Sequence, residues 1–542
     1  MKILYITTIG NTMDFFKSFI RLLLDEGHIV EVAANENDGR VPECYRKWGC
    51  KVHQIDTSRS PLCKRNFHAI KQIRMLVELS KYDIVHCHTP VASMCTRIAC
   101  RKIRKNGTKV FYTAHGFHFY KGAPLKNWLL YYPVEWLCAH FTDVLITINQ
   151  EDYALAQKKM KAKKVVYVPG VGIDLNEFSS AYIDRNKKRR ELGIEHGDKM
   201  LLSVGELSAR KNHRIVIEAL AKLNDPSVHY FIVGRGDLRD ELEALAREKG
   251  VSLHLLGFRS DVCALIQASD LFVSPSFQEG LPVALMEAIA CKIPAVCSEI
   301  EGNTDLVANS LYLFKPDDSE VLAAKIRNAL TTDNSEVINA NYAVLRSFDL
   351  RKVESILDTI YRGVLHRLIL RQRLEKELGI ERDRTLILSV GELNENKNHV
   401  TVIKALTGME NVEYLIAGRG DLKDELKNTA EALGVHLHLL GFRTDVAELY
   451  RACDLYILPS YREGLNISLV EAMASGMPCV ASNIRGNKDL INDFLFDPTN
   501  EYDVRRTLIK AITSCIGSRS YKVDQFGNEY VTKKMRDIYK CI

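Results

Sequence analysis

The chain has 542 residues, of which 46% are hydrophobic and 26% charged, and it carries a formal net charge of +6. This length exceeds what one hydrophobic core supports and suggests about three domains. The composition is typical of a globular protein and excludes a disordered, collagen-like or disulfide-rich chain.

The cysteines and the first residues indicate the compartment. The 14 cysteines lie scattered in apolar stretches, which favours reduced thiols in the cytoplasm. The start, MKILYITTIG, lacks the long apolar centre and the cleavage site of a signal peptide. Because no window reaches the roughly 18 uninterrupted apolar residues of a membrane span, we expect a soluble cytoplasmic protein, or one bound at most to a membrane surface.

The positive charge is concentrated in the first third of the chain. In residues 1–180, Lys and Arg exceed Asp and Glu by ten, so the remainder is slightly acidic. A solvated basic face explains this excess as well as attraction to anionic lipid headgroups or a phosphate-bearing acceptor does. No basic run with interleaved aromatic residues is present, which argues against nucleic acid as a partner.

Residues 1–178 alternate short apolar strands with helical stretches, a pattern that predicts a doubly wound parallel sheet. The expected strands are KILYITTI (2–9), HIVEVAA (28–34), YDIVHCH (82–88), KVFYTAH (109–115), DVLITIN (143–149) and KVVYVPG (164–170).

Three features of this first unit are candidates for chemistry. Gly10 ends the first strand and permits a tight loop near a ligand cleft. His115 ends a later strand, where its imidazole is placed for proton exchange or phosphate contact. His86 and His88 share one face of their strand and Cys87 lies on the other. With no third ligand nearby in the sequence, no metal site is expected.

The stretch KNWLLYYPVEWLCAHF (126–141) is rich in Trp, Leu and Tyr. We interpret it as a partly buried helix, with a membrane-surface patch as the alternative.

The remainder of the chain contains one unit twice. LLSVGELSARKNH (201–213) returns as LILSVGELNENKNH (386–399), and GRGDLRDEL (234–242) returns as GRGDLKDEL (418–426). LHLLGFRSDV (253–262) and EGLPVALMEAIA (279–290) return as LHLLGFRTDV (437–446) and EGLNISLVEAMA (463–474). The offset changes from 186 to 184 between a helix and a strand, where a surface loop absorbs a deletion.

The chain therefore divides into three units, 1–178, 179–365 and 366–542; we call the second copy 1 and the third copy 2. Each copy alternates strands and helices, and residues 353–380 between them should be largely helical.

Each copy carries a pair of glutamates with seven residues between them, Glu279 with Glu287 and Glu463 with Glu471. The first glutamate follows a strand, and Pro282 favours a helix that begins just after it, with Glu287 about two turns in. A helix start at the carboxyl edge of a parallel sheet suits a diphosphate, while the carboxylates accept hydrogen bonds from sugar hydroxyls. Two solvated acids at a helix start are the simpler alternative.

The turn GELSARKN (205–212) places Lys211 near the next helix, where its ammonium could neutralise a diphosphate leaving group. An ordinary lysine-rich turn is the alternative. The GRG turns at 234–236 and 418–420 are more typical of close packing than of ligand binding.

Together, the order SVGEL…K, GRGD, LGFR.D and PS..EGL…E resembles glycosyltransferase family 4, whose members are retaining enzymes of the GT-B fold. The stretch HTPVAS…YTAHGFHFYKGAPLKNWLLYYPVEW…VPGVGID resembles the bacterial subgroup that builds capsular or exopolysaccharides. The resemblance covers essentially the whole chain. It implies α/β, Rossmann-like domains with a tandem copy of the donor-binding domain.

The resemblance also implies roles. His115, Lys211 and Glu279 would be catalytic, and Gly10, Gly205, Gly280, Leu281 and Glu287 would bind the donor. Glu279 would contact the donor sugar, Glu287 the ribose and Lys211 the diphosphate. Many family members have an arginine where this chain has Glu206, so one cation is missing. The implied substrates are a nucleotide sugar, usually a UDP-sugar, and a lipid-linked or oligosaccharide acceptor, with no cofactor and no metal.

Copy 2 retains Gly391, Lys397, Glu463 and Glu471 but has no N-terminal unit of its own. We expect a non-catalytic accessory domain; the alternatives are a domain that borrows the N-terminal unit of another chain or competes for this one. Rival functions for the whole chain are a nucleotide-sugar-binding regulator and a nucleotide-sugar epimerase.

Overall fold

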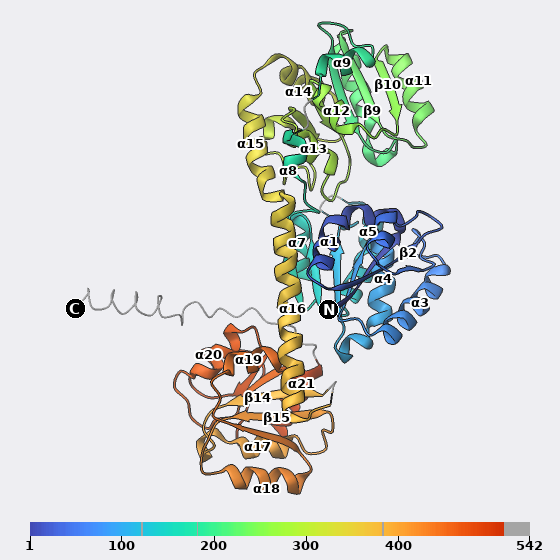
Figure 1. The fold of residues 1–542 in the computed structure, drawn as a ribbon. Helices are drawn as coiled ribbons and strands as arrows, with labels where there is room; N and C mark the ends of the chain where they lie inside the picture. The colour runs from blue at the N-terminus through green and yellow to red at the C-terminus, as the bar shows by residue number, and fades with distance from the viewer. Residues whose placement is uncertain (121–122, 181–182, 382–383, 514–542) are drawn as a thin grey trace, which may run out of the picture.

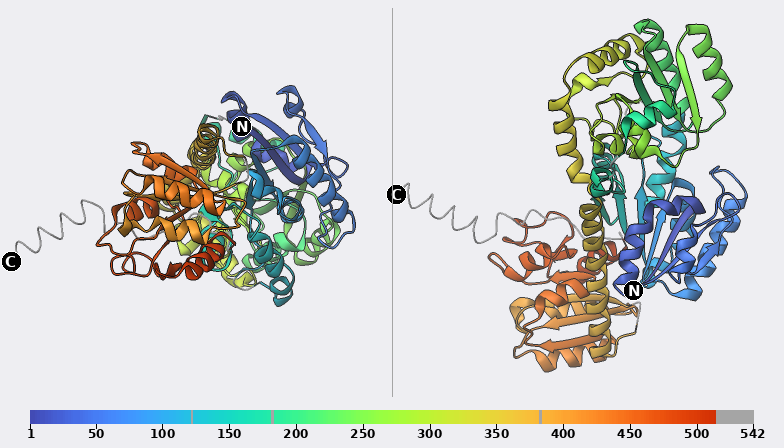
Figure 2. Two further views of the ribbon diagram at one scale, coloured as in Figure 1. Left: turned by 90° about the horizontal axis from the view of Figure 1, so that it is seen from below. Right: turned by 45° about the horizontal axis from the view of Figure 1, so that its top comes forward.

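The computed structural model describes residues 1–120, 123–180, 183–381 and 384–513. Three parallel sheets lie along one long helix, α16 (Leu350–Leu378) (Figure 1). The N-terminal unit lies beside the middle of α16, and copy 1 and copy 2 lie at its opposite ends. The two further views show the same arrangement (Figure 2).

The N-terminal unit is a seven-stranded sheet in the order β3-β2-β1-β4-β5-β6-β7. Its strands are β1 (Lys2–Ile9), β2 (Ile29–Asn35), β3 (Val52–Gln54), β4 (Ile84–His88), β5 (Lys109–Ala114), β6 (Val144–Thr147) and β7 (Lys164–Tyr167). The strand order reverses between β1 and β4, and such a switch point is where ligands bind in open parallel sheets.

Helices cover both faces of this sheet because successive side chains of a strand point to opposite sides. Tyr5 of β1 faces a core with α1 (Lys17–Asp25) and α16. Leu4 and Ile6 face a second core with α3 (Arg65–Ser80), α4 (Pro90–Cys100) and α6 (Tyr132–Ala139). The remaining elements are η1 (Gly10–Phe16), α2 (Glu43–Lys47), η2 (Ile103–Asn106), α5 (Leu125–Leu130) and α7 (Gln150–Lys159).

Copy 1 is a six-stranded parallel sheet in the order β10-β9-β8-β11-β12-β13. Its strands are β8 (Lys199–Val204), β9 (Val228–Val233), β10 (Ser252–Gly257), β11 (Leu271–Ser274), β12 (Ala295–Ser298) and β13 (Leu313–Phe314). Its helices are α8 (Leu175–Ser180), α9 (Arg185–Glu191), η3 (Ala209–Lys211), α10 (His213–Leu223), α11 (Arg239–Lys249), α12 (Val262–Ala268), α13 (Val283–Ala290), η4 (Ser310–Tyr312), α14 (Ser319–Thr331), α15 (Ser335–Leu345) and η5 (Arg346–Phe348).

Copy 2 repeats this topology in the order β16-β15-β14-β17-β18-β19. Its strands are β14 (Thr385–Val390), β15 (Val412–Ala417), β16 (His436–Gly441), β17 (Leu455–Leu458), β18 (Cys479–Ser482) and β19 (Leu495–Phe496). Its helices are η6 (Glu395–Lys397), α17 (His399–Ala405), α18 (Lys423–Leu433), α19 (Val446–Ala452), α20 (Ile467–Ala474) and α21 (Glu501–Thr513).

The six strands predicted for the N-terminal unit are confirmed, and β3 is additional because three residues are too few to show a pattern. The predicted alternation of strands and helices in both copies is also confirmed. The predicted helix that carries Glu287 is confirmed as α13, but its start was misplaced. It begins at Val283, with Pro282 as its extended N-cap, and Glu287 lies little more than one turn in. The stretch 126–141 forms two helices instead of one. The break falls near Pro133, which has no N–H to donate and whose ring clashes with the preceding turn.

The predicted helix over 353–380 is confirmed as α16, which has 29 residues and is about 43 Å long. Val353, Ile360 and Tyr361 pack on the N-terminal unit, whereas Leu370 and Leu374 pack on copy 2. In the part of the chain described, no helix, α16 included, is long and apolar enough to cross a bilayer.

The end of α16 has the same role in copy 2 that α9 has in copy 1. Arg185 and Arg189 of α9 form ion pairs with Asp270, and Arg367 and Arg371 of α16 form ion pairs with Asp454. The second copy is therefore fused to the helix that packs on the N-terminal unit.

Gly363, exposed within α16, should be replaceable with a gain in stability. A Cβ there would meet no atom within 4 Å, so Gly363→Ala should raise the free energy of unfolding by about 0.5–1 kcal/mol. Gly379, in the left-handed C-cap at φ +66°, is the matched control. Gly379→Ala should lower stability, and unfolding in urea should show opposite signs for the two variants.

Candidate functional site

A cavity of about 250 Å³ opens at the carboxyl edge of the copy 1 sheet. It lies between β8 and β11, where the strand order reverses, which is the expected place for a ligand in such a sheet. The cavity is lined by Ser203, Val204, Lys211, His213, Phe272, Val273, Ser274, Pro275, Ser276, Glu279, Leu281, Pro282, Val283 and Ala284.

The structure joins two of the predicted residues directly. Lys211 Nζ lies 2.6 Å from Glu279 Oε1, and Ser276 Oγ donates to the same oxygen over 2.6 Å. Arg210 reaches Glu279 Oε2 at 3.3 Å. Two cations therefore converge on one buried carboxylate, which gives a polar, positively charged rim to the cavity.

The two glutamates differ in protonation. Burial raises the pKa of Glu279, but the adjacent Lys211 outweighs burial and the pKa lies below its usual value. Glu279 is therefore ionised at neutral pH. Burial, together with the nearby Glu177, raises the pKa of Glu287 to about 7. Glu287 can consequently both donate and accept a hydrogen bond near neutral pH.

The glycines of this site allow close packing. A Cβ on Gly205 would meet Lys211 Cε at 3.0 Å, so the bare backbone lets the lysine cross the turn. A Cβ on Gly234 would lie 1.8 Å from the Gly205 carbonyl oxygen, so the packing interpretation of the GRG turn is confirmed in copy 1. Gly10 packs in the same manner, because a Cβ there would lie 2.3 Å from the Gly39 carbonyl oxygen.

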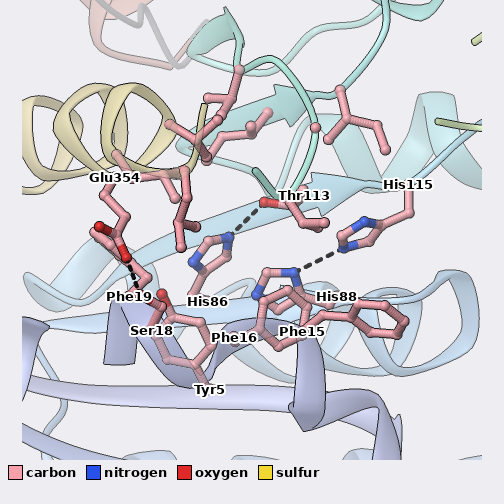
Figure 3. A pocket seen from close by; sticks show the side chains of 18 residues that line it. Tyr5, Phe15, Phe16, Ser18, Phe19, His86, His88, Thr113, His115 and Glu354 are labelled. Carbon is pink, nitrogen blue, oxygen red and sulfur yellow. Dashed lines mark hydrogen bonds between the residues drawn. The ribbon is translucent and has the colours of Figure 1, made fainter. Parts of the chain in front are cut away.

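The N-terminal unit contributes a cluster of three histidines (Figure 3). His86 contacts the hydroxyls of Tyr361, at 2.6 Å, and Thr113, at 2.8 Å. His88 Nδ1 lies 3.2 Å from His115 Nε2. Burial lowers the pKa of His86 to about 3 and that of His115 to about 4. All three imidazoles are thus neutral at pH 7 and act through hydrogen bonds, not as cations.

The N-terminal unit and copy 1 meet where two glycine-containing segments touch. The loop 115–117 after β5 lies against the turn 278–281 before α13, and we call this contact the seam. A Cβ on Gly280 would lie 1.9 Å from the His115 carbonyl oxygen, and one on Gly116 would lie 2.9 Å from Gly280 Cα. Nearby, Leu281 fills the space beside Gly170. The seam thus places the backbone of His115 against Gly280, the residue that follows Glu279.

Copy 2 has the same local site without the seam. Lys397 Nζ lies 2.6 Å from Glu463 Oε1, and Gly391 lies against Lys397 as Gly205 does against Lys211. A Cβ on Gly464 would meet nothing within 4 Å, and Leu465 is 56% exposed. Glu471 is exposed and accepts a hydrogen bond from Tyr450 at 3.2 Å.

Sequence reasoning missed Arg210 and Ser276 as neighbours of Glu279. Arg210 precedes Lys211 in the same turn, so the Arg-Lys pair was the available signal. Glu206, which the sequence excluded from a phosphate role, is exposed. Among the described residues, no group of three or more His, Cys, Asp or Glu could hold a metal.

Comparisons with known proteins define the class. Residues 15–177 match the model of Glycosyltransferase Family 4, and residues 184–344 and 371–520 each match that of Glycosyl transferases group 1. The chain is 36% identical over 335 residues to the glycosyltransferase EpsD of Bacillus subtilis (strain 168). This alignment covers 60% of this chain and 86% of the relative. It is 32% identical over 269 residues to the UDP-Gal:alpha-D-GlcNAc-diphosphoundecaprenol alpha-1,3-galactosyltransferase of Escherichia coli. This alignment covers 47% of this chain and 69% of the relative.

Solved structures show the same fold. HepE of Anabaena in complex with UDP superposes with a TM-score of 0.56 at 22% identity, covering 67% of this chain and all of that one. WaaG, a glycosyltransferase of lipopolysaccharide biosynthesis, superposes with a TM-score of 0.52 at 22% identity. The superposition covers 66% of this chain and 99% of WaaG. The protein is a glycosyltransferase of GT-B architecture with one further parallel-sheet unit. It belongs to the family Glycosyl transferases group 1, whose domain is present twice, and its N-terminal unit is a Glycosyltransferase Family 4 domain.

Adding a methyl group at the seam should separate the roles of the two copies. Gly280→Ala forces the His115 loop away from the turn that carries Glu279, and an ångström of misplacement costs roughly 100-fold in rate. Gly464→Ala is the matched control, because its Cβ enters open space. Initial rates of sugar transfer should fall only for Gly280→Ala, and an equal effect of both would contradict the importance of the seam.

Proposed function

We propose that the N-terminal unit and copy 1 together transfer a sugar, with retention of configuration, from a UDP-sugar to a lipid-linked or oligosaccharide acceptor in cell-surface polysaccharide synthesis. The observation that supports this proposal is the seam, where the His115 backbone contacts Gly280, the residue next to the Lys211–Glu279 pair. The printed names of two relatives support the substrate classes. The Escherichia coli galactosyltransferase uses UDP-Gal and a diphosphoundecaprenol-linked sugar, and a Campylobacter jejuni relative, 29% identical, acts on a diphospho-undecaprenol-linked sugar.

The charges suggest how the donor would bind. The Lys211 ammonium is paired with Glu279 in this structure, and a donor diphosphate would offer it a second, stronger partner. Glu279, ionised, would accept hydrogen bonds from the sugar hydroxyls. The partly protonated Glu287 would contact the ribose.

The remaining predicted residues would act through close packing against the donor and through hydrogen bonds of uncharged groups. His115 would lie beside the donor sugar without a positive charge. Gly10, Gly205, Gly280 and Leu281 would line the cleft, where glycines let backbone N–H groups approach the phosphates. Stabilisation of the departing UDP by Lys211, Arg210 and the start of α13 would lower the barrier without a metal.

Retention follows if the acceptor hydroxyl attacks from the face that UDP leaves. Glu279 is held by Lys211 and Ser276, and we assign it to sugar binding and not to nucleophilic attack. Positioning and leaving-group stabilisation would then supply most of the rate.

We assign the three units to 1–178, 179–365 and 366–542, and copy 2 to an accessory role. Separate cores in the three sheets support the division. The open space at Gly464 and the exposed Leu465 support the accessory role, since in copy 1 the equivalent residues contact the N-terminal unit.

We further propose that the N-terminal unit contacts the cytoplasmic face of the membrane through α5 and α6. Leu125, Leu129, Trp136 and Leu137 are exposed there, with Leu129 at 71%. In the same helical layer, α3 exposes Phe67, Met75 and Leu79 among the cations Lys64, Arg65, Lys71, Arg74 and Lys81. Exposed apolar tips among cations are the pattern of a surface that docks on anionic lipid.

Removing each first glutamate tests which copy performs transfer. The assay measures the rate of UDP release with a panel of UDP-sugars and a lipid-linked acceptor. Glu279→Ala should lower this rate by roughly 100-fold or more, because the change removes the contact to the sugar and leaves Lys211 without its partner. Glu463→Ala, the matched change in copy 2, should leave the rate within about twofold.

The opposite pattern would assign transfer to copy 2. Formation of an epimerised donor would instead support an epimerase, and donor binding without turnover would support a regulator. Analysis of the anomeric configuration of the product tests retention.

A charge on the exposed face of α5 should weaken membrane binding. Leu129→Glu places a carboxylate where an apolar side chain would meet lipid, so sedimentation with vesicles of anionic phospholipid should fall several-fold. Ile509→Glu is the control, because the Ile509 side chain is exposed on α21 in copy 2. Equal sedimentation of Leu129→Glu and the unmodified protein would rule out this face.

A further inference from the structure

Two carboxyl groups face each other beside the seam. Asp152 lies in the first turn of α7 in the N-terminal unit, and Glu301 lies in the loop after β12 in copy 1. The two groups are within hydrogen-bonding range of each other. Asp152 Oδ1 and Glu301 Oε1 are buried, and neither finds a donor among the described residues. Two carboxylate oxygens can satisfy each other only if one of them carries a proton.

Asp152 is held rigidly in this position. Its side chain is buried, and its Oδ2 accepts hydrogen bonds from the Phe117 N–H at 2.9 Å and from Asn149 Nδ2 at 3.0 Å. The Asp152 N–H in turn donates to Asn149 Oδ1 at 2.7 Å. The carboxyl group cannot turn toward solvent without breaking these bonds.

The pair is connected to both sides of the seam. Phe117, which donates to Asp152, is two residues from His115. Asn149 Nδ2 also donates to the Gly280 carbonyl, at 3.4 Å, and a Cβ on Gly302 would lie 2.4 Å from the same oxygen. The contact between Asp152 and Glu301 therefore adjoins the His115 loop and the turn that carries Glu279.

The surroundings of the pair are acidic. Among the residues that the structure describes, Glu151 of α7, Asp305 of the loop after β12 and the phenol of Tyr120 are the titratable groups that face it, and none of these three is a cation. Asp305 accepts a hydrogen bond from the Gln150 N–H at 3.1 Å. With no positive charge from these neighbours, two ionised carboxylates would repel across the seam.

Copy 2 differs at this position by a reversal of charge. Gly302, Asn303 and Asp305 return as Gly486, Asn487 and Asp489, but Glu301 returns as Arg485. Arg485 therefore offers a matched position in a copy that lacks the seam.

We propose that Asp152 and Glu301 are positioning residues that share one proton across the seam. The shared proton thereby holds the loop of His115 against the turn that carries Glu279. The proposal rests on the assignment of the N-terminal unit and copy 1 as the catalytic pair. Burial raises the pKa of both groups in the closed seam, and the charge of Asp152 raises that of Glu301 further. The closed seam therefore keeps a proton to higher pH than an open one, so closure is favoured at low pH and weakens as pH rises.

The test is the pH dependence of Glu301→Gln in the full-length protein. The glutamine amide donates to Asp152 at every pH, so it replaces the shared proton. In the unmodified protein, kcat/KM should fall on the alkaline side by up to about tenfold per pH unit, the limit for one proton. Glu301→Gln should lose this fall while keeping activity near neutral pH. Arg485→Glu should leave the profile unchanged.

Amide hydrogen exchange of the segment 278–282 gives a readout that needs no transferase activity. Compared at equal pH, exchange in the unmodified protein should exceed that in Glu301→Gln increasingly as pH rises. If the two proteins exchange alike at every pH, or if Glu301→Gln keeps the alkaline fall in kcat/KM, the shared proton is not what holds the seam. If exchange behaves as expected and no sugar is transferred, the shared proton stands and the proposed function fails.

Discussion

The contact between Gly116 and Gly280 is the constraint on which the site depends. A side chain at Gly280 would overlap the His115 carbonyl, so only bare backbone lets the two units come this close. The contact sets the distance between the histidine cluster of one unit and the Lys211–Glu279 pair of the other. Each of these two groups lies near the switch point of its own sheet, and the seam joins the two sheets beside them.

The duplication shows which features of the site depend on one unit alone. Copy 2 folds to the same strand order and forms the same lysine–glutamate pair at 2.6 Å, because these features depend on residues within one unit. What it lacks is the surface supplied by the N-terminal unit. Helix α16 explains why: its first half packs on the N-terminal unit and its end packs on copy 2, so copy 2 lies at the end of α16 that is far from copy 1 (Figure 1).

Burial and pairing give similar groups different charges. Glu279 stays ionised because Lys211 lies beside it, whereas Glu287, buried near Glu177, has a pKa raised to about 7. The histidines are neutral because burial penalises their charged form. Sequence motifs identified Glu279, Glu287, Lys211 and His115 but not these protonation states. The states depend on neighbours such as Arg210, Ser276 and Glu177, which the motifs do not include.

The sequence by itself determined the α/β class, the repeat, most strands and the helix between the copies, because periodicity and repeated motifs are local. It misplaced the start of α13, since Pro282 serves as an extended cap and not as the first helical residue. The position of copy 1 directly after residues 1–178 favoured it as the partner of the N-terminal unit, but only the tertiary structure showed that the two meet at Gly116 and Gly280 and that Asp152 faces Glu301, 149 residues away. Contacts between distant segments depend on how whole sheets pack, and no local pattern encodes that packing.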